Sequence, residues 1–450
     1  MGISFEKIKE KKLTVGIIGL GYVGYPLALV FVEAGINIIG FDLDRDKIAS
    51  IQAGKSYIKH IDHERLQQAL GKGLAKPQGE TLVSKSSFPT PTLQATDDFQ
   101  EISKCDAVIL CVPTPLNVHL EPDLHYITNT CELIAPYLQP HTLVSLESTT
   151  WPGTTKEVAL PILEEKGKLK LGKDLYLCYS PEREDPGNKN YNTKSIPKLI
   201  GGLDPKSLEL GKELYSLAIQ KVIPVKNCEV AEAAKLFENI FRSVNIALVN
   251  EFKIIFDRMG IDVWDVIEAS STKPFGFMPF WPGPGWGGHC IPVDPFYLTW
   301  KAKEFGVQTR FIELAGEINR AMPRYVLEKL QDCLNTFSKS VKGSKILILG
   351  LAYKSDVDDM RESPSLELID LLEKRGALVN YHDPFIPVIG KTRGYAHLQG
   401  KRSAPLSQDY DCFLLATKHS TFSQDEILSY GVPIVDTRNF FPKGKNIFRA

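Results

Sequence analysis

Short runs of apolar residues, each followed by a polar or glycine-containing turn, divide the first part of the chain. Runs of this kind are typical of parallel strands that are buried on both faces of a sheet. Helical patterns lie between them, and this alternation predicts a doubly wound α/β domain. Strands are expected at residues 13–19, 36–41, 107–112, 142–146 and 175–179, and a helix at about 22–34.

The middle of the chain has a different period. Apolar positions from about 231 to 259 recur at the helical spacing, which predicts one long helix, with more helix to about residue 269. The segment from Lys273 to Phe296 is rich in proline, glycine and aromatic residues, so we expect a long loop. Loops of this length inside compact chains are usually functional. Helix is expected to resume at about residue 296 and again over about 313–336.

The last section returns to short buried strands. Strands are expected at 345–353, 378–382, 412–416 and 433–436, with a helix near 365–374. The predicted fold is therefore α/β, with an N-terminal Rossmann domain, a central helical domain that contains the long helix, and a C-terminal Rossmann-like α/β domain. The expected boundaries are 1–215, 216–334 and 335–450.

Composition narrows the class of protein. The 450 residues are 43% hydrophobic and 24% charged, which excludes a disordered or fibrous chain. The net charge of -1 argues against a nucleic-acid binder. Eight scattered cysteines, without CxxC or zinc spacing, indicate reduced thiols in a cytosolic protein, and we expect no metal site. The uncharged stretch from Leu13 to Val32 resembles a membrane helix, but its glycines and proline argue against one.

A glycine-rich turn joins the first expected strand to the first expected helix. Gly19, Gly21 and Gly24 form a GxGxxG sequence, which lets a pyrophosphate approach the helix N-terminus. Asp42 ends the next strand, where a carboxylate can bind the hydroxyls of a ribose. The same carboxylate would repel a 2′-phosphate, so the pattern favours NAD over NADP. The alternative is a glycine-rich turn that binds no ligand.

Cys290 stands in the long loop, after two glycines that let a ligand come close. A thiolate at this place could attack an aldehyde carbon; the alternative is a buried, inert thiol. Lys235 and Asn239 are spaced i, i+4 on the long helix and so share one face. They could donate to an oxyanion, or they could lie on a solvated helix side.

Further polar residues follow expected strands, where ligands bind in open α/β sheets. Glu182 could be a general base or part of a charged turn, and Thr114 and Thr149 could contact a ligand or cap turns. In the C-terminal section, three cations that follow strands are suited to phosphates, although each could be surface charge. These are Lys354, Arg361 and Arg438.

Together these sequences resemble those of the nucleotide-sugar 6-dehydrogenase family, which includes UDP-glucose, GDP-mannose and UDP-N-acetylhexosamine enzymes. The resemblance covers nearly the whole chain. In the order of the family the matching segments are GLGYVG, CVPTP, ESTTWPGT, SPERE, AEAAKLFEN, GGHCIPVDP, GLAYKSDVDDMRES and VDTRN. The SPEREDPGN segment and the long loop look most like those of bacterial UDP-N-acetylglucosamine 6-dehydrogenases of surface-polysaccharide pathways.

The resemblance implies a role for each matching residue. Cys290 matches the catalytic nucleophile, Lys235 and Asn239 the pair that stabilises the oxyanion, and Asp294 a residue that organises a catalytic water. The residues that match groups used in thioester hydrolysis are Glu182 and Thr149. The matching cofactor contacts are Gly19, Gly21, Tyr22, Val23, Gly24, Asp42, Thr114, Thr149 and Arg361, and the matching substrate contacts are Glu182, Arg183, Lys235, Asn239, Gly287, Lys354 and Arg438.

The family resemblance implies an NAD-binding N-terminal domain, a UDP-sugar-binding C-terminal domain, and a four-electron oxidation of a sugar C6 alcohol through a cysteine thiohemiacetal and thioester. It also implies a homodimer formed through the central helix. One departure concerns the loop before GGHC. UDP-glucose enzymes carry basic residues there, whereas residues 277–284 have none. We therefore expect UDP-N-acetylglucosamine as substrate, with UDP-N-acetylgalactosamine, UDP-N-acetylmannosamine and UDP-glucose as alternatives.

Two other classes of protein compete with this interpretation. A two-electron β-hydroxyacid dehydrogenase also pairs a Rossmann domain with a helix that carries Lys and Asn, but it needs neither Cys290 nor residues 335–450. A non-catalytic NAD-binding regulator would not need the set of Cys290, Lys235, Asn239 and Glu182.

Overall fold

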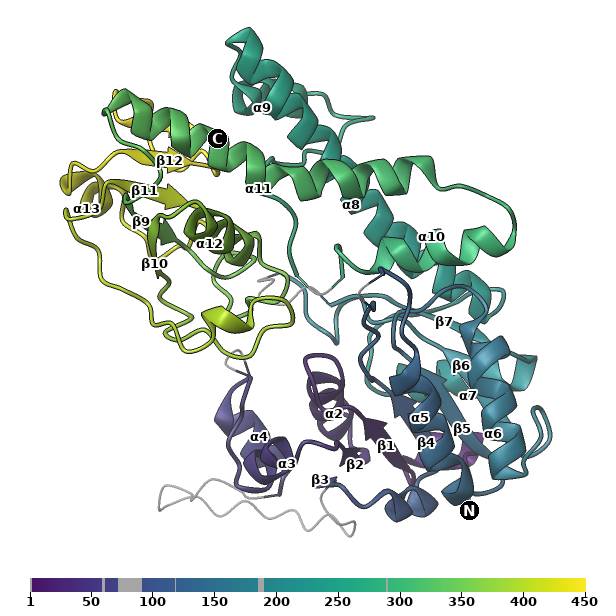
Figure 1. The fold of residues 1–450 in the computed structure, drawn as a ribbon. Helices are drawn as coiled ribbons and strands as arrows, with labels where there is room; N and C mark the ends of the chain where they lie inside the picture. The colour runs from purple at the N-terminus through teal and green to yellow at the C-terminus, as the bar shows by residue number, and fades with distance from the viewer. Residues whose placement is uncertain (1, 59–60, 72–90, 118, 185–189, 289) are drawn as a thin grey trace. The chain divides into compact units, whose positions relative to one another are not determined.

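The computed structural model describes residues 2–58, 61–71, 91–117, 119–184, 190–288 and 290–450 (Figure 1). The chain divides into two compact units, Met1–Phe237 and Glu238–Ala450. The boundary falls within one long helix, α8 (Cys228–Met259), which is the helix expected from the central apolar period. The finer division into three domains stays a prediction, and each unit is described by itself below.

The N-terminal unit is built on an eight-stranded sheet in the order β3-β2-β1-β4-β5-β6-β7-β8. Its first six strands have the Rossmann order and run parallel, whereas β6 pairs with β7 in the antiparallel direction. The expected Rossmann fold is therefore confirmed, although three strands of the sheet, β3, β7 and β8, were not foreseen. The strands are β1 (Thr14–Ile18), β2 (Asn37–Phe41), β3 (Leu93–Thr96), β4 (Ala107–Leu110), β5 (Thr142–Leu146), β6 (Leu175–Tyr179), β7 (Lys198–Gly202) and β8 (Val222–Pro224).

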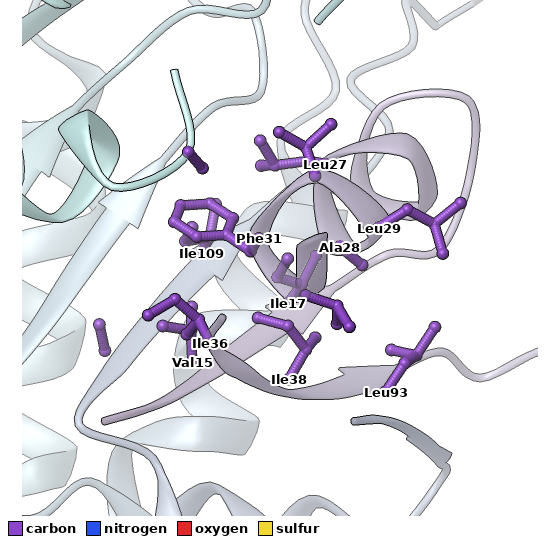
Figure 2. Close-up of a cluster of buried hydrophobic side chains, with 14 of the residues drawn as sticks. Val15, Ile17, Leu27, Ala28, Leu29, Phe31, Ile36, Ile38, Leu93 and Ile109 are labelled. Carbon is purple, nitrogen blue, oxygen red and sulfur yellow. The ribbon is translucent and has the colours of Figure 1, made fainter. Parts of the chain in front are cut away.

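The apolar runs become strands because both faces of the sheet are covered. Figure 2 shows Phe31 and Leu27 of helix α2 above Ile17 of β1 and Ile38 of β2, and all four side chains are buried. On the same face Phe31 contacts Tyr215 of α7, with ring centroids 6.0 Å apart. The helices of this unit are α1 (Phe5–Glu10), α2 (Gly24–Glu33), α3 (Arg45–Gln52), α4 (His63–Ala69), α5 (His125–Ile134), α6 (Leu160–Gly167) and α7 (Pro205–Ser216), with shorter turns η1 (Phe99–Lys104), η2 (Ala135–Tyr137) and η3 (Thr155–Ala159).

The C-terminal unit begins with most of α8 and continues through three more helices. The proline- and glycine-rich segment expected to be irregular forms no helix or strand between α9 and α10 in its described residues. His289, within it, lies outside the described residues. The three helices that follow α8 are α9 (Val263–Ser271), α10 (Asp294–Glu304) and α11 (Arg310–Thr336).

A five-stranded parallel sheet completes this unit, in the order β10-β9-β11-β12-β13. The expected strands are confirmed, and one short strand at the end of the chain was not foreseen. The elements are β9 (Lys345–Leu349), α12 (Pro364–Lys374), β10 (Leu378–His382), η4 (Ala396–Leu398), β11 (Cys412–Leu415), α13 (Gln424–Ser429), β12 (Ile434–Asp436) and β13 (Ile447–Arg449).

The two sheets repeat one turn. After β9, Gly350 has a φ of +86° and donates its N–H to the His382 carbonyl (2.9 Å), and Leu351 N–H donates to the Asp383 carboxylate (2.6 Å). That carboxylate also pairs with the buried His419 ring, whose Nε2 lies 3.0 Å away. The corresponding turn after β1 is described with the site below.

The uncharged stretch from Leu13 to Val32, which resembles a membrane helix in sequence, does not form one continuous helix. It contains β1, the glycine turn and most of α2. No helix within the described part of the chain is long and apolar enough to span a bilayer.

Candidate active site

The glycine turn after β1 has the geometry that the sequence predicts. Gly19 has a φ of +91°, which favours glycine, and its N–H donates to the Phe41 carbonyl at 2.8 Å. A Cβ on Gly19 would lie 2.6 Å from the Cys111 carbonyl oxygen, and a Cβ on Gly24 would collide with the Gly19 carbonyl oxygen. These two glycines are therefore needed for the close packing of strand against helix.

Gly21 differs, because a Cβ built on it meets no atom within 4 Å. The open space lies where α2 begins, with Tyr22 and Val23 completing the turn, and this is where a pyrophosphate would approach a helix N-terminus. The Asp42 carboxylate accepts the Leu20 N–H at 2.9 Å and is only about 10% exposed. These residues fit NAD, whose adenosine ribose Asp42 would bind.

Asp42 also has a cationic neighbour that the sequence analysis did not single out. Lys47 Nζ lies 3.2 Å from the Asp42 carboxylate. It supports the fixed orientation of the carboxylate at the end of β2, together with the Asp44 N–H, which donates to the other oxygen at 2.9 Å.

Two threonines follow the next strands of the sheet. Thr114 is buried in the loop after β4, and Thr149 is half-buried in the turn after β5. Ser148, beside Thr149, donates to the Val112 carbonyl at 2.7 Å, so the two loops are joined. Both threonines thus lie at the carboxyl ends of strands, where Rossmann domains bind their ligands.

Glu232 attaches α8 to the turn that follows Thr149. Its carboxylate is fully buried and accepts the N–H of Gly153 (2.6 Å), the N–H of Thr155 (2.9 Å) and the Thr155 hydroxyl (2.6 Å). Gly153 has a φ of +106°, so this turn needs glycine. The start of α8, including Lys235 one turn later, is therefore fixed against the turn that leads from β5 into η3.

The interpretation of Lys235 and Asn239 as a solvated helix side is wrong. Lys235 is 9% exposed and Asn239 3%. Asn239 Nδ2 donates to Asp294 Oδ2 at 2.5 Å, and Asp294 is itself buried at the start of α10. Asp294 N–H in turn donates to the Cys290 carbonyl at 2.8 Å. Cys290 is half-buried and lies four residues before the first residue of α10, so its unit brings Cys290, Asp294 and Asn239 together.

The aromatic part of the loop is held against α8 and Arg438. Gly283 N–H donates to Asn250 Oδ1 at 3.0 Å, and Asn250 Nδ2 donates to Asn319 Oδ1 at 2.8 Å. A Cβ on Gly283 would collide with the Arg438 guanidinium. Burial lowers the pKa of Arg438 to about 10, and its Nε donates to the Ala416 carbonyl at 2.8 Å. A cation therefore lies against the stretch 277–284, which has no basic residue of its own.

The glycines before Cys290 pack on the segment that follows β9. A Cβ on Gly287 would lie 2.8 Å from Tyr353 Cβ, and Gly288 N–H donates to the Arg361 carbonyl at 3.1 Å. The Arg361 guanidinium forms a bidentate pair with Asp359, at 2.9 and 2.6 Å. Gly287 thus lies beside Tyr353, which precedes Lys354 in the chain. This placement is compatible with Gly287 and Lys354 contacting the same substrate.

Glu182 belongs to a buried ionic cluster in the N-terminal unit. Its Oε1 accepts the N–H groups of Arg183 and Glu184, each at 2.7 Å, and its Oε2 lies 3.2 Å from Lys198 Nζ. Lys198 also donates to Glu147 Oε2 at 3.0 Å, and its side chain is 5% exposed. We name Glu147, Glu182 and Lys198 the carboxylate clamp.

Burial and charge separate the pKa values of these carboxyl groups. For Glu182, burial opposes ionisation, but Lys198 and the two backbone N–H donors outweigh it, and the pKa is lowered. Burial raises the pKa of Glu147 despite Lys198. Burial and the charge of Glu182 raise the pKa of Glu184 to about 7. Glu182 is therefore ionised at neutral pH.

Glu147, Lys198 and Glu232 were missed by the sequence analysis. Glu147 directly follows a strand that is buried along its whole length, and a charged residue at that place is a usable signal. Lys198 lies on β7, which the apolar pattern did not identify, and Glu232 is three residues before Lys235 on α8. Their partners are distant in sequence, so spacing could not have found them.

Comparisons with known proteins identify the family of this chain. Family models of the UDP-glucose/GDP-mannose dehydrogenase family match the NAD binding domain at residues 13–219, the central domain at 229–321 and the UDP binding domain at 347–443. The match to a UDP binding domain excludes a simple β-hydroxyacid dehydrogenase.

Curated relatives and solved structures extend the match to whole chains. A UDP-N-acetyl-D-glucosamine 6-dehydrogenase of Pseudomonas aeruginosa is 35% identical over 92% of this chain and 92% of its own. A UDP-N-acetyl-D-mannosamine dehydrogenase of Pyrococcus horikoshii is 32% identical over 97% and 99%. A solved UDP-D-ManNAc dehydrogenase from Pyrococcus horikoshii has a TM-score of 0.82 at 29% identity, over 97% of this chain and 99% of that one. The chain belongs to the UDP-glucose/GDP-mannose dehydrogenase family and is an NAD-dependent UDP-sugar dehydrogenase.

Proposed function

We propose that this enzyme oxidises the C6 alcohol of a UDP-N-acetylhexosamine, most favourably UDP-N-acetylglucosamine, to a carboxylate through a covalent intermediate on Cys290. The observation that carries the proposal is the buried Asn239–Asp294 hydrogen bond of 2.5 Å, which fixes the first turn of α10 next to Cys290. A cysteine with only a packing role would not need a buried amide and carboxylate beside its loop.

The reaction consumes the alcohol, two NAD+ and one water, and it yields the carboxylate, two NADH and three protons. NAD, when bound at the glycine turn, supplies the hydride acceptor for each oxidation. Cys290 Sγ adds to the carbonyl carbon of the intermediate aldehyde and forms a thiohemiacetal, which becomes a thioester after the second oxidation. Covalent capture keeps the reactive aldehyde from leaving.

Lys235 and Asn239 stabilise negative charge on the sugar oxygen at each tetrahedral stage. One such donor is typically worth about 3–4 kcal/mol. Their burial strengthens this effect, because a donor that is excluded from water is not screened. Asn239 can act as a fixed donor because its amide is oriented by the Asp294 carboxylate.

Hydrolysis of the thioester requires an ordered water. Asp294, Thr149 and Glu182 are the groups that we assign to this step, with Glu182 as the carboxylate that accepts the proton of the water. Its ionised state at neutral pH supports this role, since a protonated carboxyl could not accept the proton.

The aromatic loop supports an N-acetyl sugar. Residues 277–284 present Phe277, Met278 and Trp281 with exposed surface, and Trp281 stacks on Trp264 at 5.2 Å. Such a surface suits an acetamido group better than a bare hydroxyl. Arg438 and Lys354 then hold the charged nucleotide portion. The names of the relatives above include both gluco and manno sugars, so the stereochemistry at C2 is the finer part of the proposal.

We further propose that the enzyme works in the cytoplasm, where a free nucleophilic thiol stays reduced. Its product would supply uronic acids for surface polysaccharide such as lipopolysaccharide. We also propose that the enzyme is a homodimer formed through α8. Large apolar side chains are exposed along α8 at roughly the spacing of a coiled-coil seam. They are Phe237, Phe241, Leu248, Phe252, Ile255 and Met259. Sedimentation of a Phe252→Glu variant tests the dimer, and an unchanged dimer would contradict the role of this face.

A substrate panel with NADH absorbance tests the reaction. Two NADH for each UDP-N-acetylglucosamine are expected, one NADH would indicate a two-electron enzyme, and none a regulator. A Cys290→Ser variant should lose uronic acid formation. Cys131→Ala, which changes a buried cysteine of α5, should turn over at the wild-type rate. Near-normal turnover of Cys290→Ser would remove the nucleophile from the mechanism.

A further inference from the structure

The carboxylate clamp is a buried group of two acids and one base at one edge of the N-terminal sheet. Glu147 follows β5, Glu182 follows β6 and Lys198 begins β7. Because β7 runs antiparallel to β6, its first residue lies at the carboxyl ends of the parallel strands, where the site residues are. The antiparallel pairing therefore places a strand residue, Lys198, at the carboxyl ends of the parallel strands. In a fully parallel sheet a cation at this place would have to come from a loop.

In space, Lys198 lies between the two carboxylates of the clamp, Glu147 on one side and Glu182 on the other. Glu147 is fully buried and is held by the Tyr215 hydroxyl, which donates to its Oε1 at 2.6 Å. Tyr215 is in turn 2.8 Å from the Ser145 hydroxyl. Lys198 Nζ contacts both carboxylates and the Pro181 carbonyl (3.4 Å), which satisfies its three donors. Lys198 is thus fixed from one side and contacts Glu182 on the other.

We propose that Lys198 is a positioning residue for thioester hydrolysis: held by Glu147, it fixes the Glu182 carboxylate in its ionised form and in one orientation. This inference rests on the hydrolytic role of Glu182 proposed above. A structural ion pair alone does not need a buried location, since buried pairs are at best weakly stabilising relative to apolar side chains. A clamp that orders a catalytic carboxylate does need one, because water would otherwise compete for both of its oxygens.

Removal of the Lys198 charge changes Glu182 in a defined direction. Burial alone opposes ionisation of Glu182, and Lys198 is the largest influence that counteracts it. Without Lys198, the pKa of Glu182 rises, so the hydrolytic step is lost as the pH falls through a higher value. Among the residues that the structure describes, the other titratable groups that face the clamp are Cys111, Cys178, Glu184 and Tyr215.

The test uses the full-length enzyme with Lys198→Met and Lys198→Arg. For Lys198→Met we expect kcat to fall about 100-fold, in the range of lost general-base assistance, and KM for the UDP-sugar to fall with it, because the acyl-enzyme accumulates before a slowed hydrolysis. The acid limb of the kcat–pH profile should move up by at least about one unit. The initial burst of NADH should persist, and mass spectrometry of quenched enzyme should show accumulated acyl-enzyme. Lys198→Arg, which keeps the charge, should leave the acid limb in place and retain more activity.

Lys7→Met is the matched control. Lys7 pairs with Asp106 at 2.6 Å at the opposite, amino edge of the same sheet, so its loss removes an ion pair without touching the clamp. This variant should show no shift of the acid limb. Glu147→Gln should not shift the acid limb upward as Lys198→Met does. Without the negative charge of Glu147, Lys198 pairs with Glu182 only, so the acid limb should stay in place or move to lower pH.

The outcomes separate this inference from the proposed function. Wild-type hydrolysis and an unshifted acid limb in Lys198→Met would overturn the role of Lys198 while leaving the Cys290 chemistry intact. If no acyl-enzyme forms in any variant, including wild type at single turnover, the proposed function fails. If Lys198→Met does not fold, Lys198→Arg and Glu147→Gln decide, and an upward shift of the acid limb in either would refute the inference.

Discussion

Glu232 offers a direct test of how the N-terminal sheet and α8 are joined. Its buried carboxylate accepts the N–H groups of Gly153 and Thr155 and the Thr155 hydroxyl, at 2.6 to 2.9 Å. In a Glu232→Ala variant both backbone donors would lose their acceptor inside the protein. Each buried, unsatisfied donor costs about 1–3 kcal/mol, so we expect the free energy of unfolding to fall by about 2–6 kcal/mol.

A Glu232→Gln variant should cost less, about 1–3 kcal/mol, because the amide oxygen still accepts from Thr155 and only the Gly153 donor loses its partner. Glu229→Ala is the matched control on the same helix. Glu229 lies 4.0 Å from Lys156 and both side chains are partly exposed, so its loss should cost about 0.5 kcal/mol.

Urea unfolding followed by tryptophan fluorescence measures these differences, since Trp151 is buried next to this turn. Steady-state kinetics on the same variants measure the consequence for the site. Lys235 is one helical turn beyond Glu232, so kcat of Glu232→Gln should fall more than kcat of Glu229→Ala. If Glu232→Ala is no less stable than Glu229→Ala, the contact does not anchor the helix and the reasoning is wrong.

Three further predictions follow from the described contacts. Lys235→Ala should lower kcat about 100-fold or more with a much smaller rise in KM, as expected for loss of an oxyanion donor, and the reverse pattern would make Lys235 a binding residue only. Asp42→Ala should raise KM for NAD about 10-fold or more, from loss of charge-assisted hydrogen bonds, while KM for the UDP-sugar stays constant; an unchanged KM for NAD would refute its ribose role. Burial opposes ionisation of Asp383, but His419 and two backbone N–H groups outweigh it and lower its pKa, so the unfolded carboxyl takes up a proton at higher pH than the folded one. Stability should therefore fall as the pH drops below about 4, and an Asp383→Asn variant, followed by urea unfolding across that range, should show a shallower slope than the wild type.

The sequence predicted the parts of the fold that depend on local pattern. Apolar runs such as residues 142–146 became strands because both faces of the sheet are buried, and the helical period placed α8 to within three residues at its start. The strand β7 was not predicted, because it begins with Lys198 and ends with two glycines, a composition that resembles a loop. Its pairing with β6 depends on tertiary contacts that no local pattern contains.

The candidate site divides in the same way. The i, i+4 spacing of Lys235 and Asn239 placed them on one face, but only the structure shows that this face is buried and that Asp294 orients Asn239. The carboxylate clamp joins residues that are 16 and 51 positions apart in the chain. The side chain of a distant lysine decides the charge of Glu182, and sequence spacing carries no information about such a partner.

The repeated turn shows how one backbone design serves two different ligands. After β1 the acid at the end of the neighbouring strand, Asp42, keeps about 10% of its side chain open to solvent, whereas after β9 the equivalent Asp383 is sealed by His419 and has none. A carboxylate that is already saturated by its own chain cannot receive a ribose. The second sheet has thus lost the chemistry of a dinucleotide fold while keeping its geometry, and any nucleotide that it holds must be recognised by cations rather than by that acid.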